Sequence, residues 1–255
     1  SGSLIVVFTK HFVEGSRQTT TSLEQEFNVA KLGMVPDANR LKKFHGIPNS
    51  RYEFLSYEQP VSPLADSLRN IHASILFATL GNEEIRSVVV SSAAKGEGKT
   101  FISVSLATAL TCNNSVLSSC SPRRILVVDC DMRRPSIHHV FRMVINSGGL
   151  STLLTTDRAD VMGVIHKHDS IPGLFYMTAG PQVPDPAALL MSDRFRDVAE
   201  ELQKEFDFVI FDSLPILGFP DIRILSRCSD GVILVVEEGR LDQADLRTAF
   251  STVAS

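Results

Sequence analysis

The 255-residue sequence has no tryptophan, no long hydrophobic run and no strong net charge. No stretch approaches the roughly 20 consecutive apolar residues that a membrane-spanning helix needs, so we predict no transmembrane helix within these residues. The net charge of −4 produces no field that would recruit nucleic acid or an anionic membrane surface. We therefore expect no nucleic-acid partner.

The sequence also lacks the closely spaced cysteine pairs that are typical of a zinc site. Its four cysteines are scattered, at Cys112, Cys120, Cys130 and Cys228. We expect reduced thiols in a cytosolic protein rather than disulfides. The remaining composition, 44% hydrophobic and 21% charged, is typical of a globular protein, and the length suits one large α/β domain with an appendage.

From residue 63 onward, apolar runs alternate with segments of helical spacing. Strands are predicted within 87–91, 124–131, 173–180, 207–215 and 231–239, and helices within 63–80, 100–110, 192–206 and 242–250. Continuous apolar strands separated by helices predict an α/β fold, a parallel sheet with helices on both faces. We interpret residues 1–60, with a predicted helix over 21–32, as a linker and N-terminal extension, and 61–255 as the α/β domain.

The segment SAAKGEGKT, at residues 92–100, lies between a predicted strand and a predicted helix. Its glycines can adopt backbone angles closed to other residues, so loop N–H groups and the helix N-terminus can face an anion. This pattern predicts a phosphate-binding loop, although the full motif has glycine where this chain has Ala93. The alternative is a glycine turn before an ordinary helix. The predicted nucleotide-binding residues are Lys95, Gly96, Glu97, Gly98, Lys99, Thr100 and Phe101.

Two predicted strands end in aspartates. ILVVDCD places Asp129 and Asp131 on one side of a strand end, and FVIFD ends in Asp212. Ligands of open parallel sheets bind at the carboxyl ends of the strands, and buried carboxylates need a partner. Magnesium, held together with a phosphate and a hydroxyl, fits that need. The alternative is that each aspartate caps the segment that follows it.

Together these segments resemble the bacterial tyrosine kinases, the cytoplasmic kinase domains of polysaccharide co-polymerases. SAAKGEGKT resembles the Walker A motif of that family, ILVVDCDMRRP its additional Walker A′ motif, and FVIFDSLP its Walker B motif. The resemblance runs from about residue 60 to 250. It implies that residues 1–60 are a juxtamembrane linker and N-terminal extension, and that residues 61–255 form a P-loop NTPase-type kinase/ATPase domain. Partitioning and division-site ATPases share the P-loop branch, but they carry a second lysine at the position of Ala94.

The resemblance implies a division of roles among these residues. Lys99 would hold the phosphates of ATP or ADP, and Thr100 and Asp212 would hold Mg²⁺. Asp129 would be the base toward a tyrosine hydroxyl, with Asp131 supporting the metal. Because phosphoryl transfer depends mainly on alignment and charge neutralisation, these parts suffice.

The resemblance further implies an ATP-dependent protein-tyrosine autokinase that regulates exopolysaccharide polymerisation and export. It would act at the cytoplasmic face of the bacterial inner membrane, covalently joined to a membrane and periplasmic co-polymerase region. Two alternatives stay open: an ATP-binding regulatory module with reduced catalysis, and a partitioning-type ATPase.

The family also forms rings through a Glu-x-x-Arg-x-x-Arg motif, and the matching residues here are Asp66, Arg69 and His72. Their spacing predicts a shared helix face, with His72 at most partly charged. The substrate would be the tyrosine-rich tail of a neighbouring subunit. This sequence contains only Tyr52, Tyr57 and Tyr176, and neither the tyrosine cluster nor the usual last strand of the family is evident in it. We expect Tyr176 to be buried in a strand.

Overall fold

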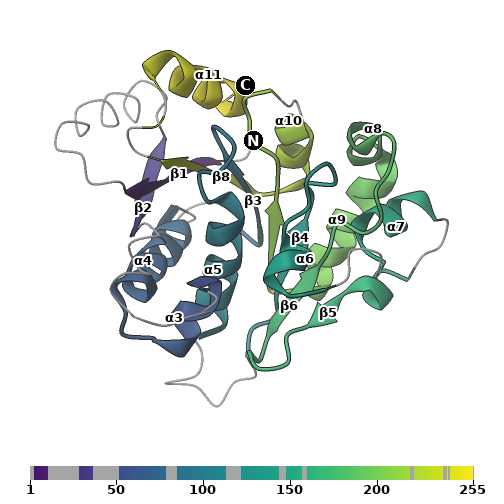
Figure 1. Cartoon of the computed structure of the whole chain (residues 1–255), viewed down its shortest axis with the longest axis horizontal. Helices are drawn as coiled ribbons and strands as arrows, with labels where there is room; N and C mark the ends of the chain where they lie inside the picture. The colour runs from purple at the N-terminus through teal and green to yellow at the C-terminus, as the bar shows by residue number, and fades with distance from the viewer. Residues whose placement is uncertain are drawn as a thin grey trace.

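The computed structural model describes residues 3–10, 29–36, 52–78, 85–112, 122–143, 148–156, 160–218, 221–237, 240 and 242–254. Eight strands form one sheet in the order β2-β1-β8-β3-β7-β4-β6-β5 (Figure 1). Every pair is parallel except β5 with β6. The strands are β1 (Ser3–Lys10), β2 (Ala30–Pro36), β3 (Ser87–Ser92), β4 (Ile125–Asp129), β5 (His166–Lys167), β6 (Leu174–Met177), β7 (Phe208–Asp212) and β8 (Gly231–Glu237).

The central strands are apolar on both sides because both faces of the sheet are covered. In β3, Val88 and Val90 belong to one hydrophobic core and Val89 to the other. β8 alternates in the same way, with Ile233 on the first face and Leu234 on the second. Side chains alternate across a strand, so a continuous apolar run supplies two cores at once.

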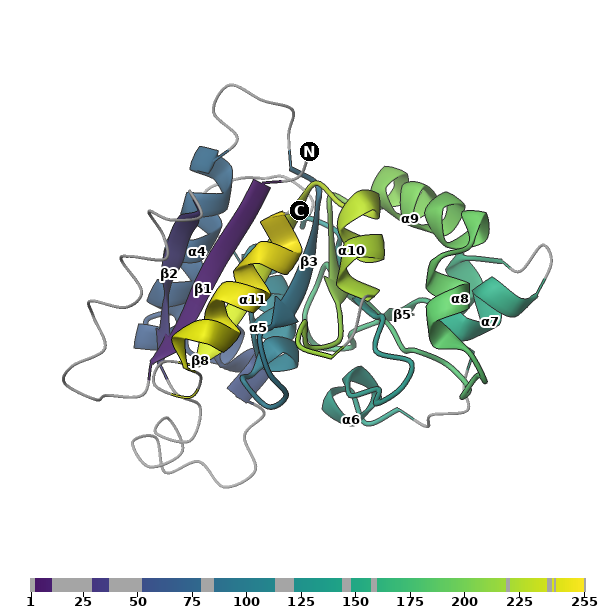
Figure 2. The same cartoon turned by 90° about the horizontal axis from the view of Figure 1, so that it is seen from above.

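Helices cover the two faces separately (Figures 1 and 2). The core on one face is completed by the 3-10 helix η1 (Tyr52–Phe54) and by α3 (Leu55–Glu58), α4 (Pro63–Ala78), α5 (Lys99–Cys112) and α6 (Ile137–Val140). The core on the other is completed by α7 (Leu150–Thr155), α8 (Pro186–Leu190), α9 (Asp193–Glu205), α10 (Asp221–Leu225) and α11 (Gln243–Ala254). The two remaining 3-10 helices are η2 (Met162–Val164) and η3 (Ser226–Cys228). The predicted α/β fold with helices on both faces is confirmed.

Helix α9 illustrates how the local sequence specifies an element. The Ser192 hydroxyl accepts a hydrogen bond from the Phe195 N–H at 3.2 Å, which satisfies one of the free amides at the helix start. Phe195, Val198 and Leu202 then recur at helical spacing and are buried against the sheet. The opposite face of this helix is charged and exposed. This pattern is why its position could be predicted within one residue at each end.

The N-terminal segment departs from the sequence-based interpretation. β1 and β2, which we expected in a linker, extend the sheet beyond β8. The helix predicted over 21–32 is wrong for residues 30–32, which belong to β2, while its first part lies outside the described residues. Leu32 and Val35 are buried against α4, and this contact with a distant helix decides in favour of a strand. No helix in the described part of the chain is long and apolar enough to cross a membrane.

Candidate active site

The sheet order brings three predicted motifs to one edge. β7 lies between β3 and β4, and Asp212 at its end is in register with Val90 on one side and Asp129 on the other. The loop after β3 and the carboxylates after β4 and β7 therefore meet at the carboxyl ends of neighbouring strands. A hydrogen bond of 2.8 Å from the Cys130 N–H to the Asp212 carbonyl joins two of these ends. This is where open parallel sheets bind ligands.

The loop after β3 has the backbone of an anion-binding loop. Gly96 and Gly98 have φ angles of +87° and +88°, which favour glycine strongly over other residues. A Cβ at Gly98 would meet no atom within 4 Å, so the side of the loop at this residue is open. Helix α5 begins immediately afterwards, at Lys99. The helix N-terminus, with its free N–H groups, therefore faces the same open space.

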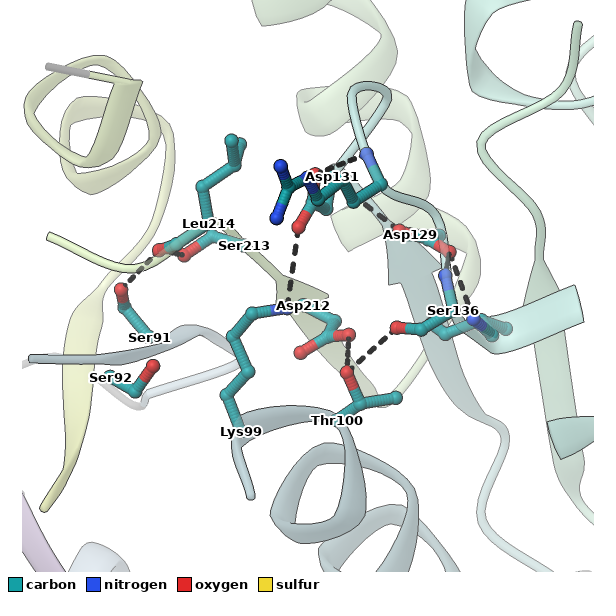
Figure 3. A network of polar contacts seen from close by, with 12 residues as sticks. Ser91, Ser92, Lys99, Thr100, Asp129, Asp131, Ser136, Asp212, Ser213 and Leu214 are labelled. Carbon is teal, nitrogen blue, oxygen red and sulfur yellow. Dashed lines mark hydrogen bonds and ion pairs between the residues drawn. The ribbon is translucent and has the colours of Figure 1, made fainter. Parts of the chain in front are cut away.

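Asp212 holds two hydroxyl groups of α5. One of its oxygens accepts a hydrogen bond from Thr100 Oγ1 at 2.7 Å, and the other accepts one from Ser103 Oγ at 2.9 Å. Thr100 Oγ1 also lies 2.8 Å from Ser136 Oγ (Figure 3). Asp212 is completely buried, and burial raises the pKa of its carboxyl, while Lys99 and the two hydroxyls oppose that rise. Ser103 escaped sequence analysis, although it follows Thr100 by one helical turn on the same face.

Lys99 points across the site toward the Walker A′ segment (Figure 3). Its Nζ lies 3.5 Å from Asp131 Oδ2, and both side chains are nearly buried. Burial opposes the charged ammonium, but the charges of Asp212, Asp131 and Asp129 outweigh burial and raise the pKa of Lys99. The lysine thus stays protonated at neutral pH and can neutralise a phosphate.

Asp129 has a different environment from its neighbour two residues later. Its Oδ1 accepts the Asp131 N–H at 3.1 Å, and its Oδ2 accepts the Ser136 and Ile137 N–H groups at 2.9 Å each. The side chain is fully buried. Burial and the charge of Asp212 raise the pKa of Asp129 to about 7, against the hydrogen bonds and Lys99. Asp129 therefore holds the Walker A′ segment in place through hydrogen bonds to the backbone of that segment.

This arrangement predicts a stability loss for Asp129→Asn. An Asn amide nitrogen cannot accept, so at least one backbone N–H would lose its acceptor, at a cost of about 1–3 kcal/mol. Asp212→Asn is the matched control, since it is equally buried but bonded to hydroxyls that can rotate and accept. Both substitutions also remove a buried charge that is unfavourable at pH 8, because the pKa of each carboxyl is raised in the folded protein. Urea unfolding at pH 8 should therefore show that Asp129→Asn is less stable than Asp212→Asn by about 1–3 kcal/mol. Equal stability of the two variants would contradict this account of Asp129.

A cavity of about 710 Å³ opens in front of these groups. Of the predicted residues, it is lined by Lys95, Gly96, Gly98, Lys99, Thr100, Phe101 and Asp131. Three others do not line it, namely Glu97, Asp129 and Asp212. Glu97, predicted to contact nucleotide, is instead buried within the loop, where its carboxylate accepts the N–H groups of Ala94 and Glu237.

Arg133 and Arg134, for which the sequence left open either a solvated turn or a phosphate- or partner-docking role, also line the cavity. The lining residues that were not predicted from the sequence are Met132, Ser136, Gln182, Val183, Pro184, Pro186, Leu214 and Pro215. The proline-rich segment 182–186 follows β6, and residues 214–215 follow β7. The rule that ligands bind beyond the carboxyl ends of parallel strands would have indicated both segments.

The residues present fit a magnesium ion bound together with phosphates. Thr100 and Asp212 offer adjacent hydroxyl and carboxylate oxygens, the ligands that Mg²⁺ prefers. Within the described residues, no group of three His, Cys, Asp or Glu side chains could hold a metal ion alone. Such a site would need oxygens from a nucleotide to complete the ligand set, as is usual for Mg²⁺ in phosphoryl-transfer sites.

The predicted ring-forming face on α4 is only partly present. Asp66 and Arg69 form an ion pair near the surface, and Arg69 Nη1 also donates to the Pro60 carbonyl at 2.7 Å. His72, however, is buried, with only 8% of its surface exposed. Burial, and to a lesser extent the charge of Arg123, lower the pKa of His72 to about 4. His72 is therefore neutral at neutral pH, in keeping with the expectation of at most a partial charge, and its burial leaves only Asp66 and Arg69 exposed. Ring assembly through these three residues stays a prediction.

This burial predicts a pH effect on stability. Unfolded His72 binds a proton near pH 6.5 and folded His72 only near pH 4, so stability falls as the pH drops between these values. The penalty at pH 4 is on the order of 3 kcal/mol. His72→Gln, which cannot titrate, should flatten this part of the profile in urea unfolding measured from pH 4 to 7. A profile parallel to the wild type would contradict the buried neutral imidazole.

The three tyrosines differ in accessibility. Tyr176 lies in β6 with 7% of its surface exposed, and its ring stacks on Phe141 at 3.8 Å between centroids. Its predicted burial in a strand is confirmed. Tyr52 and Tyr57 lie in η1 and α3, which pack on α5, rather than in the linker that we expected. Tyr57 is exposed.

The chain is similar to several known proteins, although no protein-family profile matches it. It is 30% identical over 203 residues to tyrosine-protein kinase YwqD of Bacillus subtilis, covering 79% of this chain and 80% of that protein. It is 30% identical over 186 residues to tyrosine-protein kinase Etk of Escherichia coli, covering 73% of this chain but only 24% of Etk.

Solved structures agree with these relatives. The kinase domain of Escherichia coli Etk superimposes with a TM-score of 0.75 at 25% identity, covering 91% of this chain and 87% of that domain. The BceF tyrosine kinase domain gives a TM-score of 0.73 at 28% identity, covering 91% of each chain. The chain belongs to the bacterial tyrosine-protein kinase family.

Proposed function

We propose that this chain is an ATP-dependent protein-tyrosine autokinase domain. The observation that carries the proposal is the convergence of Lys99, Thr100 and Asp131 on one cavity next to an open glycine loop, with Asp212 bonded to the Thr100 hydroxyl. Its relatives are tyrosine-protein kinases, which supports the same reaction class. In the full-length protein, the domain would lie at the cytoplasmic face of the inner membrane, joined to a co-polymerase region, and regulate exopolysaccharide export.

The residues divide the work as follows. Lys99 would hold the outer phosphate oxygens, which compete with Asp131 for the ammonium. Thr100 and Asp212, with Asp131 nearby, would hold Mg²⁺, which supplies charge neutralisation when bound. Loop amides and the start of α5 bind and orient the phosphates. These groups align the nucleotide for in-line transfer, which is the main requirement of the reaction.

The base is better assigned to Asp131 than to Asp129. A base must come within hydrogen-bond reach of the acceptor hydroxyl. Asp131 lines the cavity, whereas both oxygens of Asp129 are occupied by backbone amides behind it. We expect Asp131→Asn to reduce phosphoryl transfer more than Asp129→Asn does, after correction for nucleotide affinity. The reverse order would return the role to Asp129.

The acceptor would be a tyrosine in the tail of a neighbouring subunit. Tyr176 is stacked and buried, so it cannot align with a γ-phosphate without local unfolding. Ring assembly would use the exposed Asp66 and Arg69, and sedimentation of Arg69→Ala against the wild type tests that contact. If Arg69→Ala keeps the mass distribution of the wild type, α4 does not form part of the interface between subunits.

The test of the kinase proposal is mass spectrometry after incubation with ATP and magnesium. The 255-residue chain should hydrolyse ATP slowly with at most trace phosphate, on Tyr52 or Tyr57, whereas the full-length protein should carry phosphotyrosine that Lys99→Met abolishes. Nucleotide binding with no phosphotyrosine in the full-length protein would instead favour the regulatory-module alternative. Stoichiometric phosphate on Tyr176 would contradict the tail-dependent mechanism.

A further inference from the structure

Arg240 lies against the outer side of the phosphate-binding loop. Its Nη2 donates a hydrogen bond to the Lys95 carbonyl at 2.7 Å, and its Nη1 donates one to the Gly96 carbonyl at 3.2 Å. The guanidinium is itself oriented by Glu237, at 2.5 Å. A Cβ on Gly96 would lie 3.2 Å from Arg240 Nη2, so the side chain covers this glycine closely. Arg240 does not line the cavity, and the catalytic roles proposed above do not include it.

These two hydrogen bonds fix the direction of two loop amides. In a planar trans peptide, the C=O and the following N–H point in opposite directions. The Lys95 carbonyl shares its peptide unit with the Gly96 N–H, and the Gly96 carbonyl shares its unit with the Glu97 N–H. Because Arg240 holds both carbonyls on the outer side, both N–H groups are directed to the inner side. Lys95 and Gly96 line the cavity there.

A second contact holds the loop to the same segment of the chain. Glu97 Oε2 accepts the Ala94 N–H at 2.5 Å, and its Oε1 accepts the Glu237 N–H at 3.1 Å. Burial raises the pKa of Glu97, although these amides and Arg240 oppose the rise. Glu237 at the end of β8 and Arg240, three residues before α11, are thus attached to the loop at two points, across about 140 residues of sequence.

We propose that Arg240 is a positioning residue for nucleotide binding. It holds the Lys95 and Gly96 carbonyls outward, so that the Gly96 and Glu97 amides are directed to the inner side of the loop before a phosphate arrives. The planar fork of arginine suits this task, since it presents two donors in a rigid geometry. This inference rests on the proposed nucleotide function. It adds to the residues that support nucleotide binding an arginine on the side of the loop that faces away from the cavity.

The test compares magnesium-ADP binding by calorimetry in the wild type, Arg240→Ala, Arg240→Lys and Arg223→Ala, at 0.1 M and 1 M NaCl. Arg223 is an exposed arginine of α10, so its removal is a matched change in net charge. We expect Arg240→Ala to bind roughly tenfold more weakly at both salt concentrations, because loop geometry, unlike a long-range field, is not screened. Arg240→Lys should recover only part of the loss, and Arg223→Ala should match the wild type.

A second measurement separates loop positioning from general stability. In the ligand-free protein, hydrogen exchange of the amides of residues 94–98 should accelerate in Arg240→Ala, while the thermal unfolding temperature stays unchanged. Full recovery with lysine, disappearance of the loss at 1 M NaCl, or unchanged exchange would each overturn the proposal. Failure of the wild type to bind ADP would instead overturn the proposed function.

Discussion

Replacing Lys99 by methionine is expected to weaken magnesium-ADP binding by roughly 30- to 150-fold, or about 2–3 kcal/mol. The Lys99 side chain is nearly buried at the cavity. The negative charges of Asp212, Asp131 and Asp129 keep its ammonium group protonated. Methionine keeps much of the aliphatic stem but gives the phosphates no charge-assisted donor. Calorimetry of the purified variants measures the effect directly.

Lys95→Met is the matched control, because this lysine also lines the cavity but has an exposed side chain. We expect it to change affinity by no more than about threefold, since exposed charges contribute little. Equal losses for the two lysines would favour a site that uses both, as in the partitioning-type ATPases. Unchanged affinity in Lys99→Met would end the P-loop interpretation.

Asp212→Asn is expected to lower magnesium-dependent ATP turnover by about 10²–10³-fold while the protein remains folded. The substitution is nearly isosteric, and the hydroxyls of Thr100 and Ser103 can rotate to bond an amide. What it removes is the negative charge that a magnesium ion needs beside the threonine. Turnover and the temperature of unfolding should be measured on the same preparation.

Asp207→Asn controls for the substitution itself. Asp207 lies just before β7, at the end opposite Asp212, and accepts a single N–H from Arg124 at 2.7 Å. An Asn carbonyl oxygen can accept that bond, so wild-type turnover is expected. Wild-type turnover in Asp212→Asn, or an equal loss in both variants, would exclude Asp212 as the carboxylate that supports the metal.

Secondary structure was predicted correctly from the sequence where the residues of one short segment are enough to specify its conformation. The central strands contain runs of consecutive apolar residues, mainly valine, isoleucine and leucine, and such runs are typical of strands whose two faces are both covered. Helix α9 carries its own cap and a regular apolar stripe. The glycine loop needs two residues with positive φ, and glycine is the residue that adopts this conformation readily.

The prediction of secondary structure or burial failed where contacts between residues far apart in the sequence determine it. Residues 30–32 fit a helical pattern, but pairing with β1 and packing on α4 make them part of a strand. His72 has the spacing of a surface residue, yet its pKa of about 4 results from burial within the folded chain. The spacing of residues along α4 did not reveal that the side carrying His72 is covered in the folded chain.

By itself, the sequence determined the α/β class, the phosphate-binding loop and the three aspartates at strand ends, because backbone conformation and apolar periodicity are local properties. Only the tertiary structure decided how those aspartates differ: Asp131 faces the cavity, Asp212 holds the α5 hydroxyls, and Asp129 is enclosed by backbone amides. It also brought Arg240 to the loop, a contact spanning more than 140 residues. Such roles follow from strand order and from which groups come within hydrogen-bond distance, and neither is encoded in the spacing of residues along the chain.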